Sequence, residues 1–449
     1  MMKHFLTLMT AAFLVACHSN QFSENYTKCR EAWSSEALAQ LPMLPVWVDG
    51  TRQTISPDTL VQTTPSSDTV YSMPADAVDV MFLQLAPTPG FRIGAIRQIE
   101  SDDDRLFIRG TEIEPVTNKV LSDACFIFCR DGSLVARLEN SSSRPVCMAV
   151  NRQTREVCVV FSDDSPMSTL LYYDYEGRLL RRCSIDYMYA SDAICFSQNH
   201  LFCTTRPSRI VSEAEGLPQL TVCDPSGLPR AFFALSRPFH DEWYGYPNAS
   251  LASCGDEAFY ATSYSDTIWQ LMPEGAVARY LVRNEGVGIG SQPFDGDSTL
   301  TWDDHMLATE NLLVPTYAAN LSDHLLVSPG FIVKNYMQRS IIRVEENKSG
   351  HLMGVEQINM LTLVVDRTTG HSQWVVPRST RPSVTPFIGW TRLLLTSDDM
   401  LVSYSTPADL KYYAAHNDLY KMTDELLSLA SRINLEANPV LLLMPLKHF

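Results

Sequence analysis

The sequence predicts an all-β protein, a six-bladed β-propeller. Three observations support this prediction: a hairpin motif that recurs along the chain, a β-rich hairpin ahead of each copy, and strand-like segments near both ends that belong to no copy. A period of about 40 to 50 residues with short strands is typical of propeller blades, each a four-stranded antiparallel sheet. With 449 residues, 45% of them hydrophobic and 19% charged, the chain can bury a core of this size.

The net charge limits the classes of partner. The formal charge is −16 at pH 7, and no long run of lysine or arginine interrupts the acidic composition. Nucleic-acid binding relies on clustered cations that contact phosphates. We therefore expect no nucleic-acid partner.

The N-terminus has the features of an export signal. A short basic stretch precedes an apolar run over residues 5–15, which is too short to span a bilayer at about 20 residues per crossing. The run ends in "LVAC", which resembles the bacterial lipoprotein signal, where cleavage precedes the cysteine and lipid is attached to its sulfur. We predict a signal peptide over residues 1–16 and lipidation of Cys17, with the lipid holding the protein at a membrane. An ordinary secretion signal with an incidental cysteine is the alternative.

His18 follows the cysteine, at the position where many inner-membrane lipoproteins of Gram-negative bacteria carry aspartate. The resemblance therefore implies the outer membrane, and either the periplasmic or the cell-surface face. Residues 17–45 are polar and mixed and are predicted to form a tether. Residues 46–449 are predicted to form the propeller.

The repeated motif is the outer hairpin of a blade. In each copy a β-rich run leads into a turn with glycine, and an alternating run follows it. Glycine supplies the positive φ that a tight hairpin requires. Three residues before the glycine, an aspartate in several copies can hydrogen-bond the turn backbone, as at Asp174 and Asp224, with Asp366 one position away; Cys129 fills that place in the first copy. The turn glycines are Gly132, Gly177, Gly227, Gly275 and Gly370.

A second hairpin should precede each turn and form the inner half of the blade. Such hairpins are predicted over residues 97–110, 145–163, 192–205, 249–263 and 324–338, and a sixth blade begins at 392–405. A propeller closes its ring by pairing strands from both ends of the chain, which removes open sheet edges. We assign residues 78–85 and 440–446 to one closing sheet.

The fourth and fifth turn glycines lie 95 residues apart, about twice the usual spacing. Either a seventh blade or one blade with a long insertion fills this distance. Residues 283–323 are rich in Gly, Asp, Asn and Thr and alternate little, which favours six blades with an insert there. A helical insertion in the last blade is predicted at about 408–433, where apolar residues recur close to a 3.6-residue period.

The chain resembles the six-bladed β-propeller lipoproteins of Bacteroidetes, which are related in architecture to NHL-repeat propellers. The resemblance rests on "LVAC", on "RIGAIRQI", "RLFIRG" and "FIFCRDGSL" in order, on "YSDTIWQL" and on the closing "NPVLLLMPL". It implies an exported, lipid-anchored propeller and assigns no activity.

The cysteines offer two candidate disulfides. Cys147 and Cys158 flank one predicted inner hairpin, and Cys195 and Cys203 flank the next. Cross-strand disulfides would suit an oxidising compartment. The alternative treats these residues as small apolar fillers between packed blades.

Two further groups are candidate binding sites. The acidic stretch over 295–305 departs from the EF-hand pattern but leaves irregular calcium binding open, through Asp295, Asp297, Asp303 and Asp304. A loop after the third blade gathers aromatic and charged residues that suit a glycan or peptide groove, with a packed aromatic loop as the alternative. Its members are His240, Asp241, Glu242, Trp243, Tyr244 and Tyr246.

No nucleophile motif of the G-x-S-x-G type occurs, and the ten histidines are scattered. We therefore expect a non-enzymatic binding or scaffold lipoprotein, for a glycan, peptide or protein partner, without a cofactor other than possible calcium. The alternative is a metal-dependent hydrolase or lyase with its site in the central propeller channel.

Overall fold

A computed structural model of the protein describes most of the predicted propeller. It covers residues 40–47, 53–55, 81–102, 104–138, 144–162, 168–185, 193–204, 220–233, 249–262, 267–282, 317–319, 325–346, 352–375, 394–395, 399–420 and 422–446. Within these residues no helix is long and apolar enough to cross a membrane.

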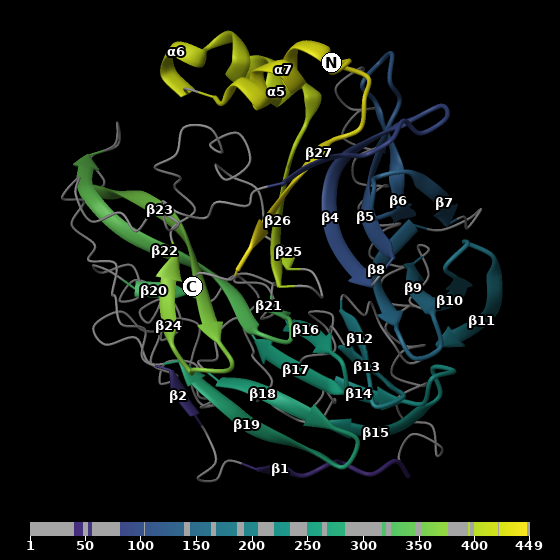
Figure 1. Ribbon diagram of the computed structural model, residues 1–449. Coiled ribbons are helices and arrows are strands. Elements are labelled where there is room, and N and C mark those ends of the chain that lie inside the picture. Colours follow the sequence, from purple (N-terminus) through teal and green to yellow (C-terminus); the bar gives the residue numbers. More distant parts are fainter. Residues whose placement is uncertain are drawn as a thin grey trace, which may run out of the picture.

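The described strands form six antiparallel sheets arranged as the blades of a propeller (Figure 1). Each of the first three blades is a four-stranded meander. Blade 1 contains β4 (Arg92–Asp102), β5 (Arg105–Ile113), β6 (Val120–Cys129) and β7 (Leu134–Leu138). Blade 2 contains β8 (Arg144–Asn151), β9 (Glu156–Ser162), β10 (Ser168–Asp174) and β11 (Leu179–Ile185). Blade 3 contains β12 (Ile194–Ser197), β13 (His200–Thr204), β14 (Leu220–Cys223) and β15 (Pro229–Phe233).

The fourth blade carries an addition from the N-terminal part of the chain. It contains β16 (Ala249–Cys254), β17 (Glu257–Thr262), β18 (Thr267–Met272) and β19 (Gly275–Val282). Two short strands, β1 (Val46–Trp47) and β2 (Gln53–Ile55), pair in parallel with its outermost strand, β19. The chain also bonds to blade 3 just before β1, where the Leu44 amide donates to the Phe232 carbonyl at 2.8 Å.

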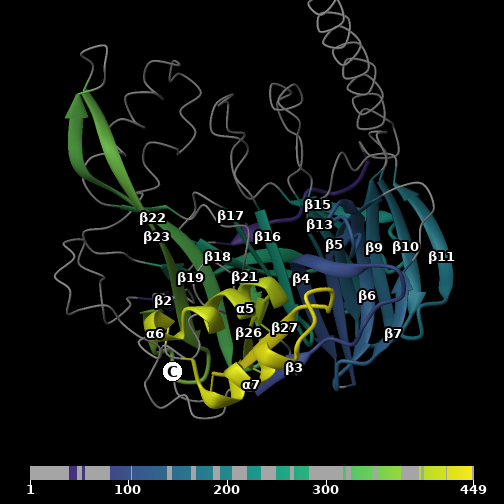
Figure 2. The same ribbon diagram turned by 90° about the horizontal axis from the view of Figure 1, so that it is seen from above.

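The fifth blade is extended by a long hairpin. It contains β20 (Tyr317–Ala319), β21 (Leu325–Val327), β22 (Phe331–Glu346), β23 (Leu352–Asp366) and β24 (Ser372–Val375). The β22–β23 pair continues to Glu346 opposite Leu352 and rises away from the ring (Figure 2). Most of the predicted insert at 283–323 lies outside the described residues, but β20 lies within it and pairs with β22.

The sixth blade closes the ring with strands from both ends of the chain. It contains β25 (Leu394–Leu395), β26 (Met400–Ser405), β27 (Val440–Pro445) and β3 (Met81–Gln84). Strand β27 pairs with β3, with Leu441 opposite Leu83. This pairing confirms the predicted closing sheet. The structure also confirms six blades and not seven, because β20 to β24 belong to one sheet.

The innermost strands of the blades surround the propeller axis. Each of β4, β8, β12, β16, β21 and β25 contacts the next, and β25 contacts β4. Alternate residues of each strand point to opposite faces of the sheet, so every blade packs against both neighbours. The buried apolar residues accordingly form six clusters, one for each pair of adjacent blades.

The helical insertion lies between β26 and β27, as predicted, but it is not one helix. It contains α5 (Pro407–Ala415), α6 (Asn417–Tyr420) and α7 (Asp424–Arg432). Thr406 and Thr423 cap the first and last of these through their side-chain oxygens. The apolar residues that suggest one continuous period instead pack from two helices against the blade 5–blade 6 core, as Leu410 and Leu426 do.

The turn glycines adopt the predicted positive φ at four of the five positions. Gly132, Gly177, Gly227 and Gly370 have φ between 75° and 90°. Gly275 is absent from the positive-φ glycines, so the expectation is wrong there. A Cβ at Gly275 would lie 2.2 Å from the Trp47 ring, so this glycine is needed for the close approach of β1 rather than for a left-handed turn.

Candidate functional site

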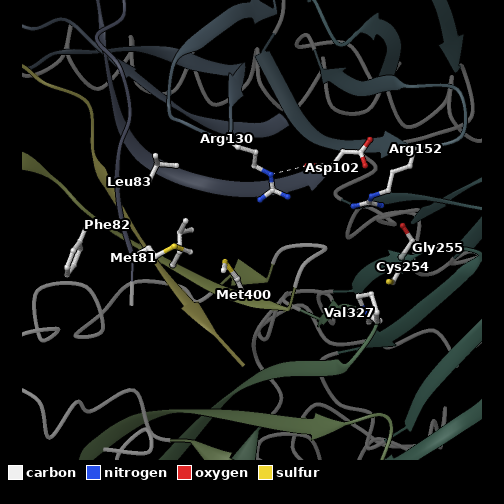
Figure 3. Close-up of a pocket in the computed structure, with 13 residues that line it drawn as sticks. Met81, Phe82, Leu83, Asp102, Arg130, Arg152, Cys254, Gly255, Val327 and Met400 are labelled. Atoms are coloured by element: carbon white, nitrogen blue, oxygen red, sulfur yellow. Dashed lines mark hydrogen bonds between the residues drawn. The ribbon is translucent and has the colours of Figure 1, made fainter. Parts of the chain in front are cut away.

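A cavity of about 710 Å³ lies on the propeller axis where the inner hairpins turn. Its lining comes from the β4–β5, β8–β9, β16–β17 and β21–β22 turns, from the turn after β6, and from blade 6, as Figure 3 shows in part. The cavity therefore draws on five of the six blades. The lining residues are Met81, Phe82, Leu83, Asp102, Arg130, Arg152, Ser253, Cys254, Gly255, Val327, Pro329, Met400 and Leu443.

Tight turns hold the polar residues in place. Arg152 follows Asn151, whose side-chain oxygen accepts hydrogen bonds from the backbone amides of Gln153 and Thr154. These bonds form an Asx turn, which fixes the backbone on both sides of Arg152. Arg130 lies in the outer turn of blade 1, where the Gly132 amide donates to the Cys129 carbonyl at 3.0 Å.

Two arginines and one aspartate form the charged wall of the cavity. Arg130 Nε donates to the Asp102 carbonyl at 3.0 Å, and Arg152 Nη2 donates to the Ser101 carbonyl at 2.8 Å. Both guanidinium groups are thus fixed to the end of β4 through its backbone. Figure 3 shows Arg130 and Arg152 extending toward the cavity from the blade 1 and blade 2 side.

The Asp102 carboxylate contacts a tyrosine of the neighbouring blade. The side chain is buried, and its Oδ2 accepts the Tyr175 hydroxyl at 2.5 Å. Burial, together with this contact, raises the pKa of Tyr175, so the tyrosine remains the donor. This hydrogen bond therefore links blade 1, which contains Asp102, to blade 2, which contains Tyr175.

Glu100 is the other acidic group beside the arginines. Its Oε2 lies 3.8 Å from Arg152 Nη2. Burial raises the pKa of Glu100, and Arg152 and Gln98 oppose that effect only in part. Glu100 thus lies beside Arg152 without forming a direct hydrogen bond to it.

The opposite wall of the cavity is apolar. Met81, Phe82 and Leu83 come from β3, and Met400 and Leu443 come from β26 and the neighbouring β27. Figure 3 shows Met81 and Met400 across the cavity from the arginines. The closing blade thus supplies a hydrophobic surface opposite the cationic one.

Cys254 is the one sulfhydryl among the lining residues, and it is not an activated nucleophile. Burial raises its pKa, although Arg152 and Arg367 act in the other direction. A thiol nucleophile needs a lowered pKa at neutral pH. The geometry consequently suits binding of an anion with an apolar part better than covalent chemistry at this sulfur.

The predicted binding groups and the predicted lipidation site lie outside the described residues. Residues 240–246, with the aromatic and acidic loop, and residues 295–304, with the four candidate calcium ligands, lie outside the described residues, as does Cys17. The strands that flank these two segments, β15 and β16 for the first and β19 and β20 for the second, are described. Among the described residues, no group of three or more His, Cys, Asp or Glu side chains is placed to hold a metal ion.

The four candidate disulfide cysteines are free thiols in the structure. Cys147 lies opposite Val160 and Cys158 opposite Ala149, so that pair is diagonal and not directly facing. Both pack in the core between blades 2 and 3.

The other candidate pair is separated by the sheet itself. Cys195 lies opposite Phe202 and Cys203 opposite Ile194, so neighbouring register positions place the two thiols on opposite faces. Cys203 packs toward blade 2 and Cys195 toward blade 4. Cys195 and Cys203 are therefore not within bonding reach of each other in blade 3.

The cavity residues are not among the sequence-predicted sites. The hairpin predicted over residues 97–110 is formed by β4 and β5, with Asp102 opposite Arg105 at its tip. The inner hairpins of a propeller surround its axis, so polar residues at their tips could have indicated this site from the sequence. These residues are Asp102 in the β4–β5 turn and Arg152 in the β8–β9 turn.

Comparison with known proteins supports the fold. No family model and no curated protein matches the chain. A solved structure of a protein from Bacteroides fragilis NCTC 9343 that is described as exported matches with a TM-score of 0.59 at 14% identity, over 88% of this chain and 99% of that one.

Two other propellers match less well. The propeller domain of the trilobed protease from Pyrococcus furiosus has a TM-score of 0.33 at 8% identity, over 70% of this chain and 90% of that one. The Dos1 propeller has a TM-score of 0.35 at 9% identity, over 72% of this chain and 92% of that one. The comparison and the sheet topology together show a six-bladed β-propeller that is similar to the Bacteroides protein.

Proposed function

We propose that the protein is a lipid-anchored binding propeller that acts outside the cytoplasm and holds its ligand in the axial cavity. The observation that carries the proposal is the cavity itself, with a cationic wall from blades 1 and 2 and an apolar wall from blade 6. Ligand pockets of soluble proteins are commonly concave, largely apolar and fitted with a few polar groups that orient the ligand.

The export signal and Cys17 give the expected location. Lipid attached to Cys17 would hold the protein at the outer membrane, on the periplasmic or the cell-surface face. The exported description of the similar Bacteroides protein agrees with this location. The expected result is that Cys17→Ala moves the protein from membrane fractions to soluble ones; continued membrane association would contradict the lipid anchor.

The ligand is expected to be a fragment of a glycan or a peptide, or the exposed end of a protein partner. A cavity of about 710 Å³ accommodates a small molecule or a short segment, not a folded domain. A larger partner would therefore insert a terminus or a side group.

The cavity is tested by obstructing it. Ser253→Trp places a large side chain at a lining position, and Leu228→Trp is a matched control on the exposed outer side of blade 3. Thermal shift against panels of short peptides, oligosaccharides and carboxylic acids should find compounds that raise the Tm of the wild type and of Leu228→Trp but not of Ser253→Trp. Equal shifts in all three proteins, or none in the wild type, would overturn the proposal. Turnover of a bound compound would instead favour the hydrolase or lyase alternative.

A further inference from the structure

We infer that the axial cavity selects a carboxylate that carries an apolar group, and that Arg130 and Arg152 bind the carboxylate. This inference rests on the proposed binding function and names the chemical class of its ligand. The observation behind it is the division of one cavity into a cationic wall and an apolar wall, each built by different blades.

The first step concerns the donors that the wall offers. A guanidinium group has five N–H donors in a planar fork. Within the described part of the chain, Arg152 makes one hydrogen bond, to the Ser101 carbonyl. Its fork therefore retains donors for a ligand, while its position stays fixed by β4.

The second step concerns charge. Among the described residues, Asp102 and Glu100 are acidic groups near the two arginines. Asp102 accepts the Tyr175 hydroxyl, and the partly buried Glu100 has a raised pKa. The Glu100 carboxylate oxygen lies 3.8 Å from Arg152 Nη2, beyond hydrogen-bond distance, so Arg152 can still bind an anionic ligand.

The third step concerns geometry and environment. Guanidinium groups bind carboxylates through two parallel hydrogen bonds, and such bonds are stronger where water is partly excluded. The side chain of Arg152 is 26% exposed, so the ion pair would form in a partly desolvated site. A neutral ligand could accept these hydrogen bonds but would not compensate the charge of the arginines.

The fourth step concerns the rest of the ligand. Met81 and Met400 line the wall across from the arginines. Burying apolar ligand surface against these side chains favours binding. Methionine side chains are flexible and adapt to apolar groups of different shape. The cavity should therefore select the apolar part of the ligand by its size more than by its exact shape.

The test compares three probes by isothermal titration calorimetry on the full-length protein: 4-phenylbutyrate, its neutral amide 4-phenylbutanamide, and acetate. We expect 4-phenylbutyrate to bind at least roughly ten-fold more tightly than the amide, because a hydrogen bond to a charged partner is lost. Acetate should bind much more weakly than 4-phenylbutyrate, because it lacks the apolar group. Affinity for the carboxylate should fall as NaCl is raised.

The variants assign the effect to the two arginines. Arg130→Met and Arg152→Met should each weaken 4-phenylbutyrate binding by roughly ten-fold or more, whereas the exposed Arg178→Met should not. Arg152→Lys keeps the charge and should retain part of the affinity, and it serves if Arg152→Met does not fold.

Two results would overturn the inference. One is equal affinity for the acid and the amide, and the other is unchanged binding in both arginine variants. If 4-phenylbutyrate fails while a panel compound without a carboxylate still binds in a manner that Ser253→Trp abolishes, the inference fails and the proposed function stands. If no compound depends on the cavity, the proposed function fails as well.

Discussion

Single carboxylates hold the outer turns of the blades. Asp224 Oδ1 accepts hydrogen bonds from the backbone amides of Ser226 and Leu228, and its Oδ2 pairs with Arg230. Burial alone would raise the pKa of Asp224, but these bonds outweigh it and the pKa lies below its ordinary value. Asp174 and Asp366 make equivalent turn contacts, which confirms the role predicted for this position.

We expect Asp224→Ala to lower the free energy of unfolding by about 1–2 kcal/mol at pH 7, because two turn amides lose their acceptor. Urea denaturation measures this change, and Glu274→Ala, at an exposed turn position of blade 4, is the control.

The pH dependence of the Asp224 contribution has a definite sign. The pKa of this carboxyl is lower in the folded state than in the unfolded chain, so its contribution is present above the unfolded value of about 3.9 and is lost as the pH falls through the folded value. The difference between wild type and Asp224→Asn should therefore shrink in acid. A difference that grows on acidification would contradict this account.

The contribution of Glu100 to stability has the opposite pH dependence. Burial raises its pKa above the ordinary value of 4.5, so the folded protein holds this proton to a higher pH than the unfolded chain does. Its favourable contribution is complete below that value and is lost as the pH rises through the folded pKa.

Glu100→Gln should therefore raise the Tm at pH 7 and have little effect below about pH 4.5. Thermal unfolding between pH 4 and 8 measures this, with the exposed Glu436→Gln as the control. A loss of stability at pH 7 would show that the contact with Arg152 outweighs the cost of burial.

At the scale of elements, the N-terminal strands show how one residue determines a contact between distant segments. The Ala276 amide donates to the Pro45 carbonyl at 3.0 Å, and β1 runs in parallel along β19. The Trp47 ring covers Gly275, where any side chain would collide with it. The glycine thus permits a strand to be added to a blade that is already complete.

Gly275→Ala should release β1 from blade 4 and lower the free energy of unfolding by about 1–3 kcal/mol, since an inserted methyl group has no space. Limited proteolysis in the segment before β3 should become faster. Trp47→Ala should cancel most of the effect of Gly275→Ala, and an undiminished loss in the double variant would contradict the collision.

At the scale of the whole molecule, the period of the turns was sufficient to predict the ring. Four turns with a positive φ and the pairing of β27 with β3 follow from local sequence and from the need to remove open edges. The parallel addition of β1 and β2 could not be predicted, because it depends on a long-range contact at Gly275.

The cavity could not be predicted from the sequence for a related reason. Asp102, Arg130 and Arg152 are ordinary turn residues in the sequence, and they acquire a common environment only when blades 1 and 2 are placed around one axis. Alternating patterns specify which face of a strand is buried, not which turns meet. The cysteines show the same limit, because spacing alone cannot tell that Cys195 and Cys203 face different blades.

Ring closure should control the stability of the molecule as a whole. Strand β3 covers the edge of β27 and brings Leu83 against the core between blades 6 and 1, where Leu441 is fully buried. A chain that begins at residue 86 loses this strand, exposes the β27 edge and uncovers part of that core. We expect it to unfold at a clearly lower urea concentration than a chain that begins at residue 78, which lacks β1 and β2 equally but keeps β3. A synthetic peptide of residues 78–90 should restore part of the loss by pairing with β27 in trans. Equal midpoints for the two chains would mean that the ring does not depend on its N-terminal strand.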